Sequence, residues 1–175
     1  FMHWLKTHVG ISSESPVTEL SAADKLEEFR KEQDGYLWQS FEPICASADH
    51  AAIVHYSATK DSNVPVTENG LFLTDTGGGY LEGSTDITRT FAFGNVPQNM
   101  KEDFTSVLLC NLHLANIVFL YGTTGGSLDV IGRLPLWKRG LDFNHGTGHG
   151  VGYLMNIHEE PARFRRYLGN KAPIQ

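Results

Sequence analysis

The sequence predicts a mixed α+β domain, because strand-like and helix-like segments alternate without the regular order of parallel βαβ units. The clearest strand signal is a hairpin built around residues 71–90, in which an apolar run, 71–74, and a return strand, 87–93, flank a glycine-rich turn. The clearest helical signal spans residues 100–121, where apolar side chains recur at three- and four-residue intervals. A chain of 175 residues fits one domain with a substantial core.

The other elements are predicted from capping residues and periodicity. Thr18 and Ser21 are N-cap candidates for a helix that Gly35 ends, and Pro135 disturbs a later helix. Short apolar runs bounded by polar or glycine-rich segments predict further strands. The expected helices are 22–33, 100–121 and 128–137, and the expected additional strands are 41–46, 51–56 and 153–158.

Composition and charge restrict the classes of partner. The net charge of −6 gives no electrostatic reason to expect a nucleic acid or an anionic membrane as partner. The longest apolar tract is interrupted by polar side chains, and residues 1–10 lack the pattern of a signal peptide. Cys45 and Cys110 form neither a CxxC redox motif nor a zinc-knuckle spacing. Two isolated cysteines suit a reducing compartment, although one long-range disulfide stays open.

Two aspartates lie near the inner ends of the predicted hairpin strands. If the loop centres near residues 80–81, Asp75 and Asp86 become opposite partners, whose Cβ atoms lie about 4.5–5.5 Å apart. Carboxylates at that distance repel each other unless a cation or a proton intervenes, so the pair is a metal-site candidate. The alternative is ordinary turn chemistry, because Asp next to Gly is common in turns. An EF-hand is excluded, since glycines stand where further oxygen ligands would be needed.

A second cluster is the run HGTGHG at residues 145–150, which places His145 and His149 among glycines. Glycine lets the backbone approach closely, so both rings can reach a bound ion, while a loop with solvated histidines is the alternative. His55 and His158 end two apolar runs, where histidines are more often structural. With the aspartates, these histidines form a ligand set suited to Mn²⁺, Co²⁺ or Zn²⁺. Serine catalysis has no support, because the sequence holds no GxSxG element.

Three stretches resemble the Xaa-Pro aminopeptidases (aminopeptidase P), which are metallopeptidases with the pita-bread fold. They read AAIVHY, TDTGGGYLEGSTDITRTFAFG and LDFNHGTGHGVGYLMNIHEEP. The resemblance implies an α+β fold with a curved antiparallel sheet and helices on its outer face, incomplete in this chain. It also implies the roles of six residues: metal is bound by Asp75, Asp86 and His149, and the substrate site is lined by His55, His145 and His158, which assist proton transfer.

The same resemblance implies a dinuclear centre of two divalent ions, with manganese expected here, and two further glutamate ligands that we expect beyond residue 175. We therefore expect residues 1–16 to be a lead-in from an upstream domain. Residues 17–175 would be a metallopeptidase catalytic domain that lacks its C-terminal strands and is inactive in isolation. The implied activity is release of the N-terminal residue from peptides with proline in second position, by a cytoplasmic enzyme that is a homodimer at full length. The resemblance implies no nucleic-acid or membrane partner.

Two alternatives to this function stay open. Pita-bread domains also serve as non-catalytic binding modules, but in those the ligand positions are usually replaced, whereas here all three testable positions are retained. The nearer rival is a methionine aminopeptidase or a creatinase-like hydrolase, against which TDITRT, GTGHGVG and NIHEEP favour the prolyl-specific branch. One local departure is that ASADHAAIVHY lacks the asparagine that often precedes the histidine in this family.

Overall fold

The computed structural model describes residues 1–11 and 15–166, and these form two compact units. Unit 1 consists of Phe1–Val96 together with Gly152–Ile157, and unit 2 consists of Pro97–Val151 together with the described residues from His158 onward. Among the described residues, no helix is both long enough and apolar enough to cross a membrane.

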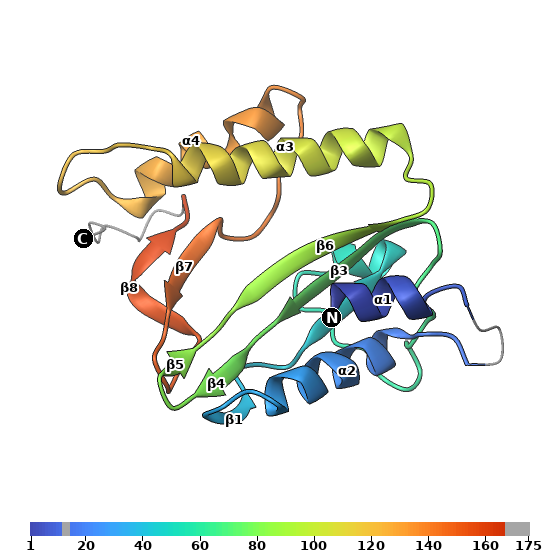
Figure 1. Ribbon diagram of the computed structural model, residues 1–175. Helices are drawn as coiled ribbons and strands as arrows, with labels where there is room; N and C mark the ends of the chain where they lie inside the picture. The colour runs from blue at the N-terminus through green and yellow to red at the C-terminus, as the bar shows by residue number, and fades with distance from the viewer. Residues whose placement is uncertain (12–14, 167–175) are drawn as a thin grey trace. The chain divides into compact units, whose positions relative to one another are not determined.

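Unit 1 is built on two small antiparallel sheets, with strand orders β2-β3-β6 and β1-β4-β5. The hairpin predicted from the sequence is confirmed as the long ribbon of β3 and β6, drawn in green in Figure 1. The elements of this unit are α1 (Met2–His8), α2 (Glu19–Lys31), β1 (Tyr36–Gln39), β2 (Ile44–Ser47), the 3₁₀ helix η1 (Ala48–Ala52), β3 (Gly70–Thr76), β4 (Gly78–Tyr80), β5 (Gly83–Ser84) and β6 (Ile87–Phe93).

The two faces of the β2-β3-β6 sheet have different neighbours, because successive side chains of a strand point to opposite faces. Phe72 of β3 is buried in a cluster with Leu5 of α1 and Ala22 of α2. The next residue, Leu73, packs instead against the cluster that contains Tyr56. Helices α1 and α2 therefore cover one face of this sheet, and they lie along the same side of the ribbon in Figure 1.

The start of α2 confirms Thr18 as the N-cap. The Thr18 side chain accepts a hydrogen bond from the Ser21 amide, and the Ser21 hydroxyl accepts one from the Thr18 amide. This reciprocal pair satisfies two backbone donors that a helix end leaves unpaired. The helix consequently begins at Glu19, three residues before the predicted start at residue 22.

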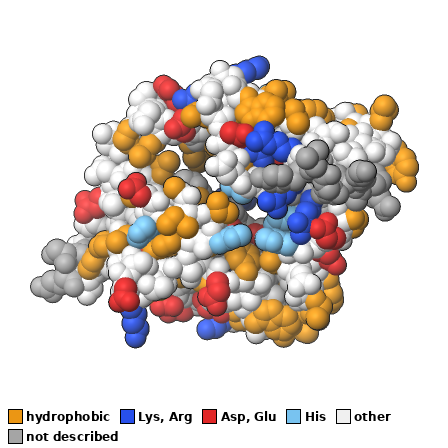
Figure 2. All heavy atoms as spheres, turned by 180° about the vertical axis from the view of Figure 1, so that it is seen from behind, with side chains coloured by type: hydrophobic (Ala, Val, Ile, Leu, Met, Phe, Trp, Pro, Cys, Tyr) orange, Lys and Arg blue, Asp and Glu red, His pale blue; other side chains and the backbone are white. Residues whose placement is uncertain are grey.

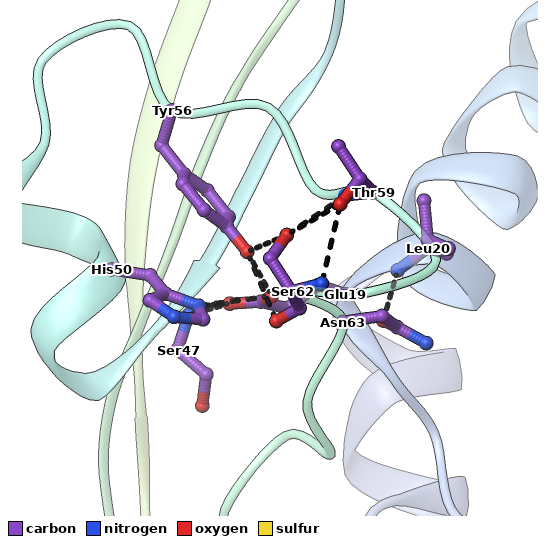
Figure 3. A network of polar contacts seen from close by, with 8 residues as sticks. All are labelled: Glu19, Leu20, Ser47, His50, Tyr56, Thr59, Ser62 and Asn63. Atoms are coloured by element: carbon purple, nitrogen blue, oxygen red, sulfur yellow. Dashed lines mark hydrogen bonds and ion pairs between the residues drawn. The ribbon is translucent and has the colours of Figure 1, made fainter.

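The strand predicted for residues 51–56 is wrong, because η1 and turns occupy this segment. The cause is Glu19, a fully buried carboxylate that accepts hydrogen bonds from the Ser47 amide at 2.7 Å and the Tyr56 hydroxyl at 2.7 Å, and contacts His50 Nδ1 at 2.9 Å (Figure 3). A buried carboxylate needs such partners, and gathering them from both sides of η1 prevents an extended strand. Because the prediction used local periodicity alone, it could not include this tertiary contact.

Unit 2 is a pair of packed helices followed by a β-hairpin: α3 (Gln98–Ala115), α4 (Gly125–Trp137), β7 (Gly148–Val151) and β8 (His158–Phe164). Both predicted helices are confirmed, although α3 ends at Ala115 rather than near residue 121. Asn116 is its C-cap, and the backbone and side-chain N–H groups of Asn116 both donate to the Leu112 carbonyl. Pro135 is accommodated inside α4. The strand predicted for residues 153–158 is wrong, since His158 opens β8 and the residues before it form bends.

Candidate functional site

The register of the β3–β6 hairpin places Asp75 and Asp86 as diagonal neighbours. Asp75 is paired with Thr88, and the same register continues through the turn to pair Tyr80 with Gly83. Asp86 is therefore two residues from the partner of Asp75 and on the same face of the ribbon. The predicted direct opposition is wrong, because the turn centres between residues 81 and 82 rather than near 80–81. Diagonal neighbours in a sheet lie about 7–8 Å apart, within reach of one ion bridging two carboxylates.

Asp75 carries a buried oxygen that needs a partner. It shares the face of Leu73, opposite the face covered by α1 and α2. Its Oδ1 atom is inaccessible to solvent and has no hydrogen-bond partner within the part of the chain that the structure describes. Leaving a charged buried oxygen unpaired costs free energy, and a bound divalent cation would remove that cost. The donor environment of Asp75 therefore fits a metal ligand.

Gly77 keeps the two hairpin segments close together immediately after Asp75. A Cβ atom on Gly77 would lie 1.9 Å from the Thr85 carbonyl oxygen and 2.3 Å from Ser40 Oγ. The Ser40 hydroxyl in turn donates to the Thr85 carbonyl at 2.8 Å. Because any side chain would push these groups apart, glycine at this position fixes the path of the chain between the two aspartates.

In unit 2, the β7–β8 hairpin brings His149 and His158 together. His158 pairs with Val151, which lies two residues after His149, so the two rings are diagonal neighbours across the hairpin. Their ring centroids are 4.0 Å apart, and one nitrogen of each ring lies within 4.8 Å of the other. Gly150 allows this close pairing, because a Cβ there would lie 2.5 Å from the Glu159 carbonyl oxygen.

The tautomer of His149 is set by the backbone carbonyl of the next residue. Its Nδ1 atom lies 2.9 Å from the Gly150 carbonyl oxygen, which can only accept a hydrogen bond. The proton of the neutral ring is therefore on Nδ1, and the lone pair is on Nε2. Metal-ligating histidines commonly have this arrangement, in which a carbonyl orients the ring and increases its basicity.

His145 belongs to a loop that is fixed by the α4 side chain Arg133. The Arg133 guanidinium donates to the carbonyl oxygens of Phe143 at 2.6 Å and His145 at 2.7 Å. The His145 ring stacks on Phe143 with centroids 4.7 Å apart, and its Nδ1 lies 2.7 Å from the Gly146 carbonyl oxygen. The glycine-rich run is thus held at its beginning by hydrogen bonds to a buried side chain.

Asp142 gives this loop a predicted acid sensitivity. Burial by itself would raise the pKa of Asp142, but hydrogen bonds from Arg133, Trp137 and the Phe143 amide lower it to about 2. A carboxyl group that titrates near 3.9 when unfolded therefore stabilises the fold fully above about pH 4, and this contribution is lost as the pH falls to 2. We expect wild type to exceed Asp142→Asn in unfolding free energy by about 1–2 kcal/mol at pH 6. Denaturant unfolding from pH 6 to pH 2 checks this, and a difference independent of pH would contradict it.

His55 is exposed and lies in the turn that follows η1, rather than at the end of a strand. The Tyr56 amide donates to the Ile53 carbonyl at 3.1 Å, which closes this turn around His55. His145 and His158 are also exposed, and Figure 2 shows histidine side chains, in pale blue, open at the surface. The three histidines predicted to line a substrate site are therefore accessible to solvent.

Sequence reasoning missed the side chains that hold the histidine loop and the turn with His55. Arg133 and Asp129 are almost fully buried and form an ion pair at 2.9 Å, four residues apart on α4. The available signal was their i, i+4 spacing inside an otherwise apolar helix, which marks a charge pair on one helix face. Glu19 had no such signal, because its partners lie 28 to 37 residues away along the chain.

Comparison with known sequences shows the family of this chain. The sequence profile of metallopeptidase family M24 matches residues 1–175. Aminopeptidase P2 of Arabidopsis thaliana is 43% identical over 175 residues, covering all of this chain and 24% of the relative. A probable Xaa-Pro aminopeptidase P of Aspergillus flavus is 42% identical over 161 residues, covering 92% of this chain and 24% of the relative. The chain thus spans about a quarter of the length of these curated relatives.

Solved structures show the same fold. X-prolyl aminopeptidase from Caenorhabditis elegans, described as a cytosolic enzyme with a di-nuclear active site, superposes with a TM-score of 0.89 at 39% identity, covering 98% of this chain and 28% of that one. Prolidase from Pyrococcus furiosus gives a TM-score of 0.78 at 29% identity, covering 90% of this chain and 44% of that one. The predicted α+β pita-bread fold, incomplete in this chain, is confirmed, and the chain belongs to metallopeptidase family M24.

Proposed function

We propose that this chain is part of a metal-dependent aminopeptidase that releases the N-terminal residue from peptides with proline in second position. The observation that carries the proposal is the buried, unpartnered Asp75 oxygen on the face it shares with Asp86, in a chain of a metallopeptidase family. The names of its relatives, aminopeptidase P and X-prolyl aminopeptidase, support the substrate class.

Asp75, Asp86 and His149 are the proposed protein ligands of a centre with two divalent ions, with Mn²⁺ as the expected metal. Two carboxylates and one imidazole form a hard-to-borderline donor set that suits Mn²⁺. The Asp75 oxygen and the Nδ1–H tautomer of His149 support this assignment. When bound, such ions lower the pKa of a coordinated water and so supply hydroxide at neutral pH.

His55, His145 and His158 are proposed to act on the peptide itself. Their exposure supports contact with a substrate, and an imidazole N–H can donate a hydrogen bond to a carbonyl oxygen as negative charge develops there. Because His145 Nδ1–H already donates to the Gly146 carbonyl, His145 can donate to the substrate only through the Nε2–H of a protonated ring. His145 or His158 would take that donor role, commonly worth a few kcal/mol of transition-state stabilisation. His55 would assist proton transfer.

The cellular location, the partner and the assembly of the enzyme are also proposals. The C. elegans neighbour is described as cytosolic, which supports a cytoplasmic location for this protein. Both cysteines are free, as suits a reducing compartment. The proposed partner is a peptide substrate, and the proposed assembly of the full-length enzyme is a homodimer.

A substrate comparison on the full-length protein tests the activity. With Mn²⁺ present, we expect Arg-Pro-Pro to be cleaved with a kcat/KM at least about 100-fold higher than a Met-Ala peptide, since a pocket that discriminates against the wrong residue supplies a few kcal/mol. Chelation with EDTA should abolish cleavage, and added Mn²⁺ should restore it. Preferential cleavage of Met-Ala would instead favour a methionine aminopeptidase, and binding of peptide without turnover would favour a non-catalytic module.

A further inference from the structure

Arg133 directs its guanidinium donors at the loop that carries His145. It is 2% exposed, and it donates to the carbonyl oxygens of Phe143 and His145 and to Asp142 Oδ1 at 2.8 Å. Its Nε atom donates to Asp129 Oδ2 at 2.9 Å. Two of these bonds end on backbone atoms on either side of Asn144, so they fix the path of the chain and do not depend on the side chains there.

Asp129, the ion-pair partner of Arg133, holds the loop at Thr147. Asp129 is fully buried, and its Oδ1 atom accepts a hydrogen bond from the Thr147 hydroxyl. The Thr147 amide donates to the Phe164 carbonyl in β8 at 2.8 Å. The Arg133–Asp129 pair therefore fixes the chain on both sides of Gly146, at His145 and at Thr147. The Thr147 amide then connects this segment to the β7–β8 hairpin.

Stability alone is a weak explanation for this pair. Burying two ions costs several kcal/mol per ion, and an apolar pair of similar size is often as stabilising or more so. Arginine differs from an apolar side chain in offering a rigid planar set of donors that defines positions and angles. Here the Phe143 ring also lies against the guanidinium, 3.9 Å from ring centroid to carbon, and the His145 ring stacks on the same phenylalanine.

We propose that Arg133 is a positioning residue, which with Asp129 fixes the orientation of the His145 ring for its action on the substrate. This inference rests on the proposed function, because it assigns Arg133 to the same reaction as His145. Arg133 acts on His145 through the backbone. Its hydrogen bonds hold the carbonyl groups of residues 143 and 145, and this backbone positions the His145 ring on the Phe143 ring. The stacking then determines the direction of the imidazole. A displacement of about 1 Å at a group that acts on the reacting atoms can lower a rate about 100-fold.

A double-mutant cycle in the full-length protein tests the proposal. We expect Arg133→Lys to lower kcat about 10- to 100-fold per folded enzyme, with KM and bound metal nearly unchanged. In a His145→Ala background, the same substitution should change kcat less than about threefold, because the residue through which it acts is already gone. Arg139→Lys is the matched control, since Arg139 forms ion pairs with Glu102 and Asp103 in the same unit. Equal losses in both backgrounds, or a loss only in the yield of folded protein, would overturn the proposal.

A milder variant and a second measurement keep the test decisive if Arg133→Lys does not fold. Thr147→Val removes the hydroxyl that Asp129 binds and should lower kcat, whereas Thr147→Ser should restore it. In NMR spectra, stacking on Phe143 should shift the His145 Cε1–H resonance away from that of exposed His3, and both Arg133→Lys and Thr147→Val should reduce this shift. The position of the His145 resonance does not depend on turnover, so the two proposals can fail separately. If the wild type cleaves no Xaa-Pro peptide, the proposed function fails. If the resonance is unchanged in both variants, the positioning role of Arg133 is overturned.

Discussion

Asp75→Asn in the full-length protein is expected to eliminate binding of at least one divalent ion and to lower kcat/KM on Xaa-Pro peptides at least about 100-fold. Asparagine has nearly the same shape but no charge, and its amide nitrogen cannot ligate a cation. The Asp75 Oδ1 atom is buried without a hydrogen-bond partner among the described residues, so its compensation must come from a bound ion or a proton. Calorimetric titration with Mn²⁺, together with metal analysis of the purified protein, measures the loss.

The matched control is Asp34→Asn, an equal change of charge at an exposed loop position in the same unit. It should leave both the number of bound ions and kcat/KM as in wild type. The variant Asp75→Asn should fold with a stability at least equal to that of wild type when no metal is present, because asparagine places no charge at the buried, unpartnered position. Full metal occupancy and full activity in Asp75→Asn would refute the role of this carboxylate as a ligand.

The elements predicted correctly from the sequence are those whose signals are local and strong. The ribbon of β3 and β6 has a turn rich in glycine, and α3 and α4 have apolar side chains at helical spacing over several turns. The small strands β1, β4 and β5 were missed, since two to four residues contain too little periodicity to detect. Helix α1 was missed as well, because its buried surface is limited to Leu5 and becomes evident only through the cluster it joins.

The error in the hairpin register has a definite physical origin. Three consecutive glycines, 77–79, permit several turn conformations, so the sequence does not determine where the reversal occurs. In the structure β4 and β5 continue the register of β3 and β6 toward a turn at residues 81–82. The offset leaves Asp75 and Asp86 on one face, because moving a partner by two residues preserves the face whereas moving it by one would not.

The candidate site shows a similar division between local and tertiary information. The proposed ligands and histidines were all named from short, distinctive sequence stretches, and the chemistry of the side chains alone suggested a divalent metal. The residues that support them, Arg133 and Glu19, were not named. Their function depends on hydrogen bonds to backbone atoms. Because backbone carbonyl and amide groups are present whatever the side chain, such bonds cannot be recognised from the sequence.

The largest stability effect is expected for Glu19→Ala. The substitution leaves the buried Ser47 amide without its side-chain acceptor and creates a cavity next to His50 (Figure 3). It also removes the shortest hydrogen bond of the Tyr56 hydroxyl, which keeps only its longer contacts with Ser62. Leaving a buried donor without its charged acceptor costs about 1–3 kcal/mol, and the cavity left by the missing side chain adds to this, so we expect a loss of about 3–5 kcal/mol in total. Native-state hydrogen exchange should therefore show the opening free energy of the β2 and β3 amides lowered by about that amount.

Two comparisons separate the network from other effects of changing α2. Glu28→Ala, on the same helix, removes an exposed ion pair with Lys25 and should cost less than about 1 kcal/mol. Glu19→Gln keeps one acceptor oxygen and should therefore fall between wild type and Glu19→Ala. Because the network lies within unit 1 and spans both sides of the turn that carries His55, Glu19→Ala should also increase exchange in residues 47–56 while leaving α4 protected. If Glu19→Ala and Glu28→Ala were equally mild, the carboxylate would not be what holds this segment out of an extended conformation.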